Sequence, residues 1–355
     1  MTQGGRRRAL DAFPRRPPFD ANAPIPLTVF GINEQAPGPR WQSLFAATWP
    51  ADRKWYLQRD VRSRPTLPLA QDMLALHMPE LMPTYQRMVE LASEVTTAAG
   101  EDDDVVARML TLWDPPRFLP GCSQAVITQP EVAVCRNYDY SPELWERVLY
   151  SSRFGGRQVI GNSDCLWGLI DGMNDDGLVV SLSFGGRRGS GPGFAVSLVV
   201  RYLLEVASST EQARELLTRM PVAMAYNLTM VDAEKRVLTA YVAPGRAAEF
   251  SSSPIATNHR GEVPDSIEHA HQYASVERRT CLAELLDDRP DGDDLVAAFL
   301  RPPLYSTQYW RAFGTVYTAL YRPATGSVEM CWPDRRWVRH FDDGDSSFPV
   351  VLKPS

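Results

Sequence analysis

The sequence predicts a layered α+β fold in which two packed β-sheets are covered by helices. Residues 41–113 space many apolar side chains three and four positions apart, which is the period of an amphipathic helix. From residue 122 onward, blocks of short β-type runs alternate with helical blocks and end in a strand pair. In addition, 44% of the 355 residues are hydrophobic, which is enough to fill a large core.

The charge balance and the hydropathy pattern exclude two classes of protein. Lys and Arg number 37 against 43 Asp and Glu, a formal net charge of −6, so no phosphate-tracking surface is expected. The longest apolar candidate, residues 194–206, is interrupted by Arg201 and Glu205 and falls short of the roughly 18 to 20 residues that span a bilayer. We therefore expect no nucleic-acid partner and no membrane partner.

The N-terminus and the cysteines indicate the cellular setting. Residues 1–25 carry arginines and prolines without the apolar region of a secretory signal, so we expect a disordered arm. The five cysteines are odd in number and widely spaced, with no CxxC pair, which fits neither a disulfide framework nor a zinc ribbon. This usage predicts a reducing, cytoplasmic location.

Residues 26–121 are expected to form an α-rich N-terminal segment. Apolar side chains between Met73 and Val95 follow the helical period, and Pro79 and Pro83 are expected to break or kink that helix. The acidic stretch 101–104 then favours the start of a short helix, because carboxylates stabilise a helix N-terminus.

Residues 122–355 are expected to form the β-rich portion, since the proline-rich stretch 115–120 is unsuited to helix and a sheet is predicted to begin at Cys122. Strands are expected at 125–128, 132–135, 148–151, 158–160, 178–183, 228–231, 237–242, 254–257, 315–321 and 327–331. Helices are expected at 194–207, 211–220, 275–286 and 294–300.

The Gly121-Cys122 pair has the chemistry for self-cleavage. If this peptide bond were cut, Cys122 would carry both a thiol and a free α-amino group with a pKa of roughly 7.7 to 8.0, so one residue would supply nucleophile and general base. A thiolate can attack the preceding carbonyl, and Gly121 has no Cβ to obstruct that approach.

Arg136 and Asp139 follow on the next predicted strand. A guanidinium beside Cys122 would lower the pKa of the thiol, and a carboxylate could orient the α-ammonium. From the residues alone, a surface position for Arg136 and a turn-forming role for Asp139 before Ser141-Pro142 stay open.

Four successive blocks together resemble the N-terminal-nucleophile hydrolases: Gly-Cys-Ser-Gln at 121–124, Arg-Asn-Tyr-Asp at 136–139, Asp-Gly-Met-Asn at 171–174 and Thr-Asn-His at 257–259. The bile-salt (choloylglycine) hydrolases share this order. The helical segment ahead of Gly-Cys makes the chain more similar to the acyl-CoA:6-aminopenicillanic acid acyltransferase family. The resemblance covers residues 122–355.

This resemblance implies a four-layer αββα fold, made as a precursor and cut into fragments 1–121 and 122–355 that stay associated. Cys122 would be the nucleophile, flanked by Arg136 and Asp139, and Asn258 would donate its side-chain amide to the oxyanion hole. Such a donor is worth roughly 2.7 to 4 kcal/mol in the transition state. The implied substrate is a small-molecule acyl amide or acyl-CoA, with no cofactor and no metal.

Three further residues are secondary candidates by the same resemblance. Arg278 matches the family's helix arginine, with a surface ion pair as its alternative, and Asn227 lies where relatives show polar residues, with a turn role as its alternative. Bile-salt hydrolases carry a second oxyanion Asn in a Leu-Asn-Phe triplet, whereas this chain has Leu182-Ser183-Phe184. The second donor is therefore expected at Ser183 or at a backbone N–H.

Two other readings stay open. An uncut, catalytically silent relative would act as a binding protein, and an uncut cysteine hydrolase would use His259 in place of the α-amine. His259, His269 and His271 lie close together without an HExxH pattern, so a solvated loop is preferred over a metal site. The sequence leaves the acyl group, the acceptor and any homo-oligomer open.

Overall fold

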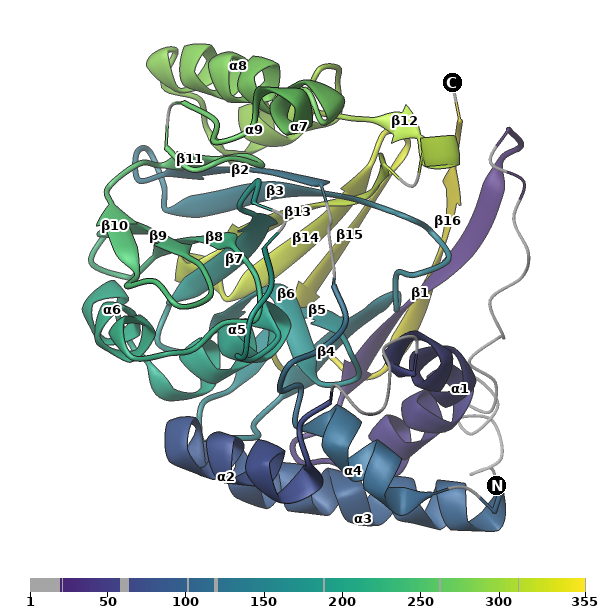
Figure 1. The fold of residues 1–355 in the computed structure, drawn as a ribbon. Helices are drawn as coiled ribbons and strands as arrows, with labels where there is room; N and C mark the ends of the chain where they lie inside the picture. The colour runs from purple at the N-terminus through teal and green to yellow at the C-terminus, as the bar shows by residue number, and fades with distance from the viewer. Residues whose placement is uncertain are drawn as a thin grey trace.

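The computed structural model describes residue 20 and residues 22–57, 64–100, 102–117, 121–187, 189–261, 263–311 and 313–354, with only the backbone described at residue 269. In these ranges two β-sheets stack between layers of helices (Figure 1). This arrangement confirms the predicted αββα order.

The larger sheet has nine strands in the order β10-β9-β8-β7-β6-β5-β4-β1-β16. Its neighbours pair antiparallel except for β1 and β4, which are parallel. Its strands are β1 (Ile25–Asn33), β4 (Val148–Ser152), β5 (Val159–Asp164), β6 (Gly168–Asn174), β7 (Val179–Phe184), β8 (Tyr226–Val231), β9 (Val237–Val242), β10 (Glu249–Ser251) and β16 (Ser346–Leu352).

The smaller sheet has seven strands, ordered β11-β2-β3-β13-β14-β15, with β12 paired to β13. All of its pairs are antiparallel. Its strands are β2 (Gly121–Ile127), β3 (Ala133–Tyr140), β11 (Ile255–Ala256), β12 (Thr307–Gln308), β13 (Phe313–Arg322), β14 (Ser327–Trp332) and β15 (Arg335–His340).

Helices cover the outer faces of both sheets. In Figure 1, α7, α8 and α9 lie above the smaller sheet, α5 and α6 lie below the larger one, and α1–α4 form a further group at the bottom. The α-helices are α1 (Pro39–Tyr56), α2 (Leu67–His77), α3 (Met82–Ala98), α4 (Asp103–Leu110), α5 (Val196–Val206), α6 (Thr210–Thr218), α7 (Ile267–Gln272), α8 (Ser275–Asp287) and α9 (Gly292–Phe299). Short 3₁₀ helices are η3 (Pro79–Leu81), η4 (Tyr309–Arg311) and η5 (Pro323–Thr325).

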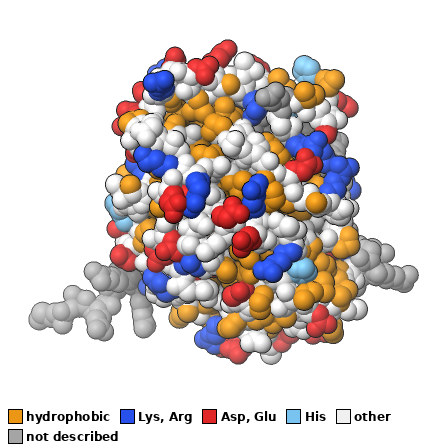
Figure 2. All heavy atoms as spheres, turned by 90° about the vertical axis from the view of Figure 1, so that its left-hand side faces the viewer, with side chains coloured by type: hydrophobic (Ala, Val, Ile, Leu, Met, Phe, Trp, Pro, Cys, Tyr) orange, Lys and Arg blue, Asp and Glu red, His pale blue; other side chains and the backbone are white. Residues whose placement is uncertain are grey.

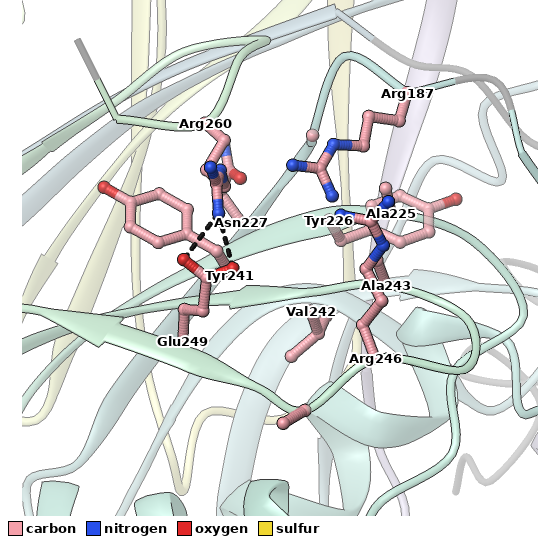
Figure 3. Close-up of a pocket in the computed structure, with 12 residues that line it drawn as sticks. Arg187, Ala225, Tyr226, Asn227, Tyr241, Val242, Ala243, Arg246, Glu249 and Arg260 are labelled. Atoms are coloured by element: carbon pink, nitrogen blue, oxygen red, sulfur yellow. Dashed lines mark hydrogen bonds and ion pairs between the residues drawn. The ribbon is translucent and has the colours of Figure 1, made fainter. Parts of the chain in front are cut away.

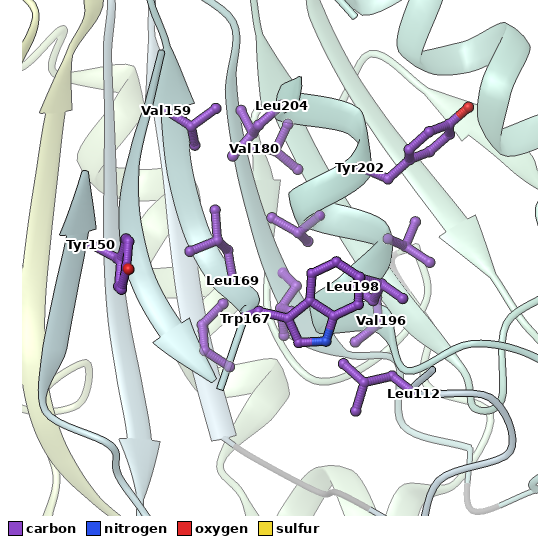
Figure 4. Packing of buried hydrophobic residues seen from close by; sticks show 14 of the residues in the cluster. Leu112, Tyr150, Val159, Trp167, Leu169, Val180, Val196, Leu198, Tyr202 and Leu204 are labelled. Atoms are coloured by element: carbon purple, nitrogen blue, oxygen red, sulfur yellow. The ribbon is translucent and has the colours of Figure 1, made fainter. Parts of the chain in front are cut away.

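Helix α5 shows how the larger core is built. Its apolar side chains, including Leu198 and Leu204, pack against β5–β7, and Trp167 fills the space beside them (Figure 4). Fully burying a Leu or Val side chain contributes roughly 1.5 to 3 kcal/mol, so the many buried apolar side chains of α5 hold it tightly to the sheet. A smaller core, which includes Ile127 and Phe299, joins the other sheet to α8 and α9.

The helical N-terminal segment is confirmed, and its breaks fall where the prolines predict them. Helix α2 ends at His77, η3 begins at Pro79, and α3 begins at Met82. The Asp102 side chain accepts a hydrogen bond from the Asp104 N–H and so caps α4.

The prediction that the sheet begins at Cys122 is wrong, because β1 already lies inside the larger sheet between β4 and β16. Pro26, near its start, hides the strand character of β1 in the sequence. Likewise β15 is a charged, largely exposed edge strand and gives no apolar alternation. Most of the predicted arm, residues 1–19 and 21, lies outside the described residues.

The surface offers no single-sign tract on the face that Figure 2 shows. There basic and acidic side chains lie interspersed with apolar ones. Among the described residues, no helix combines the length and the apolar character needed to cross a membrane.

Candidate active site

Strand β2 places Cys122 between the two sheets, where it is fully buried. Its Sγ accepts a hydrogen bond from Arg136 Nη2 at 2.9 Å. Its backbone N–H donates to Asn258 Oδ1 at 3.0 Å, and its carbonyl oxygen accepts from Arg278 Nη1. The structure thus brings together four residues that are far apart in the sequence.

Arg136 is fixed by groups from two other strands, β6 and β13. Its Nη1 forms a buried ion pair with Asp171 of β6 and also donates to the hydroxyl of Tyr317 on β13. Tyr317 and Tyr321 donate to the two oxygens of the same carboxylate, so Asp171 is saturated by partners. A buried charge is tolerable only when it is paired in this way, and Asp171 therefore orients Arg136 toward the thiol.

The acidity of the thiol reflects its burial. Burial raises the pKa of Cys122 to about 11, although the positive charges of Arg136 and Arg278 act in the opposite direction. The expected effect of Arg136 on the thiol is present, but burial outweighs it in the uncut chain. The thiol is therefore protonated at neutral pH in this state.

Asn258 and Arg278 form the second side of the site. Arg278 Nη2 donates to Asn258 Oδ1 at 2.7 Å, and Asn258 Nδ2 donates to the carbonyl oxygen of Phe184 at 3.2 Å. The N–H of Asn258 donates to Ser275 Oγ, at the start of α8, which fixes the end of the β11 segment. Arg278 is thus no surface residue but a buried neighbour of the nucleophile.

Asp139 lies on β3 opposite Gly121 in the β2–β3 register. Its Oδ1 accepts from Thr315 Oγ1 at 2.7 Å, and its Oδ2 lies 3.7 Å from Arg278 Nη1. Burial raises the pKa of Asp139, while Arg278 and Thr315 lower it. A carboxylate at this position can accept an ammonium group at the first residue of a cut β2.

Gly121 is required for a reason that the sequence does not reveal. A Cβ on Gly121 would come within 2.0 Å of the Phe313 ring and 3.0 Å of the Asp139 Cβ. The Phe313 ring is held by Tyr273, whose ring centroid lies 4.9 Å away. Only glycine therefore fits at the residue before Cys122 without displacing its surroundings.

Ser183 and Asn227 stand behind the site. Ser183 Oγ donates to the carbonyl oxygen of Thr257 at 2.9 Å. Asn227 Nδ2 donates to the carbonyl oxygens of Thr257 and His259, at 3.0 and 2.9 Å. These contacts hold the backbone on both sides of Asn258, and they give Ser183 and Asn227 a positioning role.

His259 faces α8. Its Nδ1 is 2.7 Å from Ser275 Oγ, and burial together with Arg279 and Arg278 lowers its pKa to about 4. No hydrogen bond between His259 and Cys122 occurs in the described residues, so nothing here supports His259 as the base. In the part of the chain that the structure describes, no three His, Cys, Asp or Glu side chains gather as metal ligands; the His269 side chain lies outside it.

Sequence reasoning missed the groups that orient Arg136. Asp171 stands in one of the quoted blocks, but its role as the partner of Arg136 depends on the pairing of β5, β6 and β7. Tyr317 and Tyr321 are four residues apart on a strand and therefore share a face, which was the available signal. The residues that pack against that face can be named only once the fold is known.

The assembled groups suit acyl transfer through sulfur. The Cys122 thiol contacts the Arg136 guanidinium, and the Cys122 backbone nitrogen contacts the Asn258 side-chain amide. The Asp139 carboxylate lies on the strand position opposite Gly121. A thiol can act as a nucleophile, a guanidinium can stabilise its anion, a carboxylate can hold an ammonium group, and an amide can donate to developing negative charge.

Comparison with known proteins gives one family match. The family model described as acyl-coenzyme A:6-aminopenicillanic acid acyl-transferase matches residues 127–337, more than half of the chain. The match includes Arg136, Asp139, Asn258 and Arg278 and begins just after Cys122. No curated protein matches the chain.

Three solved structures are distantly similar. Penicillin V acylase from Agrobacterium tumefaciens has 13% identity and a TM-score of 0.42, covering 61% of this chain and 84% of that one. An N-acylethanolamine-hydrolyzing acid amidase ortholog from Caenorhabditis elegans has 16% identity and a TM-score of 0.43, covering 62% and 99%. A mutant of the conjugated bile acid hydrolase from Clostridium perfringens has 11% identity and a TM-score of 0.43, covering 66% and 98%.

Proposed function

The chain belongs to the acyl-coenzyme A:6-aminopenicillanic acid acyl-transferase family, and on this premise we propose that it is a self-cleaving cysteine enzyme that transfers or hydrolyses acyl groups through a thioester on Cys122. The substrate is a small-molecule amide or a thioester such as an acyl-CoA. The cysteine usage supports a cytoplasmic setting.

Maturation begins with the thiol of Cys122. The thiolate attacks the carbonyl carbon of Gly121, the C–N bond between Gly121 and Cys122 breaks, and the nitrogen takes a proton to become the α-amine. Water then hydrolyses the resulting thioester and leaves a carboxylate on Gly121. Two contacts of Cys122 support this step, because Arg136 binds the sulfur and Asn258 binds the backbone nitrogen, and these are the two atoms whose charge changes.

Turnover repeats the chemistry on an external substrate. The free α-amine takes the thiol proton, the thiolate attacks the acyl carbonyl, and the leaving amine or thiol receives the proton. Water or an acceptor amine then attacks the thioester and regenerates the thiol. Asp139 and the Asn258 side-chain oxygen hold the α-ammonium, and Asn258 Nδ2, which gives one N–H to the Phe184 carbonyl, has a second N–H to donate to the oxyanion.

The observation that carries the proposal is the convergence of Arg136, Asn258 and Arg278 on one fully buried cysteine. Such a buried, protonated thiol is unfavourable for reaction with an external substrate as long as the chain is uncut, whereas the Gly121 carbonyl belongs to the adjacent residue. Cleavage converts the buried backbone nitrogen into an amine and opens the strand end. The same burial favours the alternative of a silent binding protein if cleavage never occurs.

Trapping the thioester tests the proposal. The protein is mixed with an excess of an N-acyl amide or acyl-CoA, quenched in acid and digested, and the mass of the peptide that begins at Cys122 is measured. We expect a mass increase equal to the acyl group on this peptide, in wild type and in a Cys281→Ala control. Turnover without any acyl group on Cys122, or with the acyl group on another residue, would refute the proposal.

Alkylation gives a second test of the same thiol. In cleaved protein, iodoacetamide at near-neutral pH should label Cys122 before the other four cysteines and abolish activity. In uncut protein Cys122 should not be labelled first, because it is buried and the partly exposed Cys281 reacts before it. Equal labelling of all five in the cleaved form would count against the assignment.

A further inference from the structure

A pocket beside the active site is lined by three arginines. It is a shallow, partly open pocket that lies where the chain after β7, the turn after β9 and the segment after Asn258 meet. Figure 3 shows Arg187, Arg246 and Arg260 directed into this space from different segments, with Tyr241 and Val242 along its wall. Three guanidinium groups gathered around one pocket create a local positive potential that favours an anion.

The acids around the pocket balance this charge only in part. Arg260 forms an ion pair with Glu249, which also lines the pocket, and Arg187 Nε lies 2.6 Å from Asp265 Oδ2. Arg246 forms no ion pair with any residue that the structure describes. Three guanidinium groups therefore face two carboxylates, and one positive charge is left for a ligand.

Asp265 shows that the three guanidinium groups act on a common point. The hydrogen bond from Arg187 and the charges of Arg187, Arg260 and Arg246 together lower the pKa of this carboxyl, against the effect of its partial burial. Asp265 itself is not among the residues that line the pocket, whereas the three arginines are, so the positive charge that acts on Asp265 also borders the pocket.

Backbone connections place the pocket next to the catalytic groups. Gly185 lines it and directly follows Phe184, whose carbonyl oxygen accepts the Asn258 side-chain N–H. Asn227 also lines it and donates to the carbonyl oxygens of Thr257 and His259, on either side of Asn258. A molecule held in the pocket therefore lies against the backbone that positions Asn258.

We propose that the pocket of Arg187, Arg246 and Arg260 binds an anionic group, a carboxylate or a phosphate, carried by the substrate. Arginine suits this role because its planar guanidinium donates two parallel hydrogen bonds to either group. The anion comes from the acyl acceptor or from the thioester donor. The link to acyl transfer rests on the proposed function, whereas the anion site itself does not.

Binding of inorganic pyrophosphate to the Cys122→Ala protein tests the site without any need for activity. Calorimetry should show saturable binding that weakens about ten-fold or more in Arg246→Glu and less in Arg246→Lys, which keeps the charge but loses the paired donors. Arg87→Glu, which changes the same charge on the exposed face of α3, should bind like the parent. Equal affinity in Arg246→Glu and Arg87→Glu, or no binding by the parent, would overturn the proposal.

Kinetics of the cleaved enzyme then identify the source of the anion. One pair of substrates is an N-acylglycine and the N-acylethylamine with the same acyl chain; the other is an acyl-CoA and the matching acyl-pantetheine, which lacks the phosphates. We expect Arg246→Glu to raise KM for the anionic member of one pair by about ten-fold and to leave its neutral partner unchanged. Equal effects on both members of both pairs would overturn a role in substrate binding, and pyrophosphate binding in a protein without acyl turnover would refute the proposed function alone.

Discussion

Two buried arginines, Arg136 and Arg201, each pair with a carboxylate but differ in the other groups that they contact. Arg201 on α5 pairs with Glu205 at 3.1 Å and donates to Ser152 Oγ at 2.8 Å and to the Trp167 carbonyl at 2.9 Å. All three acceptors are oxygen atoms that bind a guanidinium strongly. The bonds of Arg201 to Ser152 and Trp167 join α5 to the larger sheet.

Arg136 has a carboxylate partner as well, but its Nη2 points at a thiol. A protonated thiol is a weak acceptor, and the contact becomes strong only when the sulfur is an anion. Burial and ion pairing alone therefore do not identify a catalytic arginine. A donor directed at a group that gains charge during the reaction does.

The largest effect should come from Asn258, on the catalytic side of this comparison. Asn258→Ala removes an amide donor that binds charge only in the transition state, so kcat should fall about a hundred-fold to a thousand-fold with little change in KM. The measurement is made on protein that has been shown by mass to be cleaved, because the same donor serves maturation. A cleaved Asn258→Ala protein with the wild-type rate would move the oxyanion donor to Ser183 or to backbone N–H groups.

Asp171→Asn should have a smaller effect: it should lower kcat, and it should also make the Cys122 thiol more acidic. The substitution loosens the orientation of Arg136, so kcat should fall by roughly ten-fold. It also removes a negative charge that raises the pKa of Cys122, so alkylation of the mature thiol should shift to lower pH. If both the rate and the alkylation profile match wild type, Asp171 does not position Arg136.

Arg201→Gln tests the expectation that Arg201 contributes to stability and not to the reaction. It leaves Glu205 buried without its charge partner, which should lower the free energy of unfolding by about 3 to 5 kcal/mol. Activity per folded molecule should be unchanged. Arg201→Met combined with Glu205→Leu removes both charges and should recover most of the stability. A loss of kcat in the folded double variant would show that the two arginines are not functionally distinct.

The last effect concerns stability alone and has no bearing on the rate of the folded enzyme. Burial, with Asp164 and Asp52 nearby, raises the pKa of Glu146 to about 8. The unfolded chain loses this proton near pH 4.3 and the folded chain near pH 8, so stability falls as pH rises between these values, by at most about 1.4 kcal/mol per pH unit.

Glu146→Gln keeps the hydrogen bonds with Ser163 and Leu166 but does not titrate. Its stability should equal that of wild type below about pH 4.5 and exceed it increasingly up to about pH 8, as followed by urea unfolding. Parallel pH profiles for the two proteins would show that Glu146 has no raised pKa.

The sequence predicts the parts of the fold that carry local periodicity and the parts of the site that lie in recognisable blocks. Helices α2 and α3 follow from apolar spacing and proline breaks, and the αββα order follows from the alternation of strand and helix blocks. Strands β1 and β15 are not predictable in this way, since the first depends on pairing with β16 and the second is an exposed edge.

The same limit applies to the site. Cys122, Arg136 and Asn258 are recognised by their blocks, and the structure brings them into contact. The Asp171–Tyr317 support of Arg136 and the clash of a Gly121 side chain with Phe313 depend on tertiary contacts between distant strands. Their residue types alone carry no such information.

The central claim is that Cys122 cuts its own chain, and the intact mass of purified protein tests it most directly. We expect wild type to give two associated fragments, residues 1–121 and 122–355, and Cys122→Ala to remain one chain of 39.7 kDa. Arg201→Met with Glu205→Leu should be cut like wild type. A folded wild-type protein that remains at 39.7 kDa under all conditions would contradict the account.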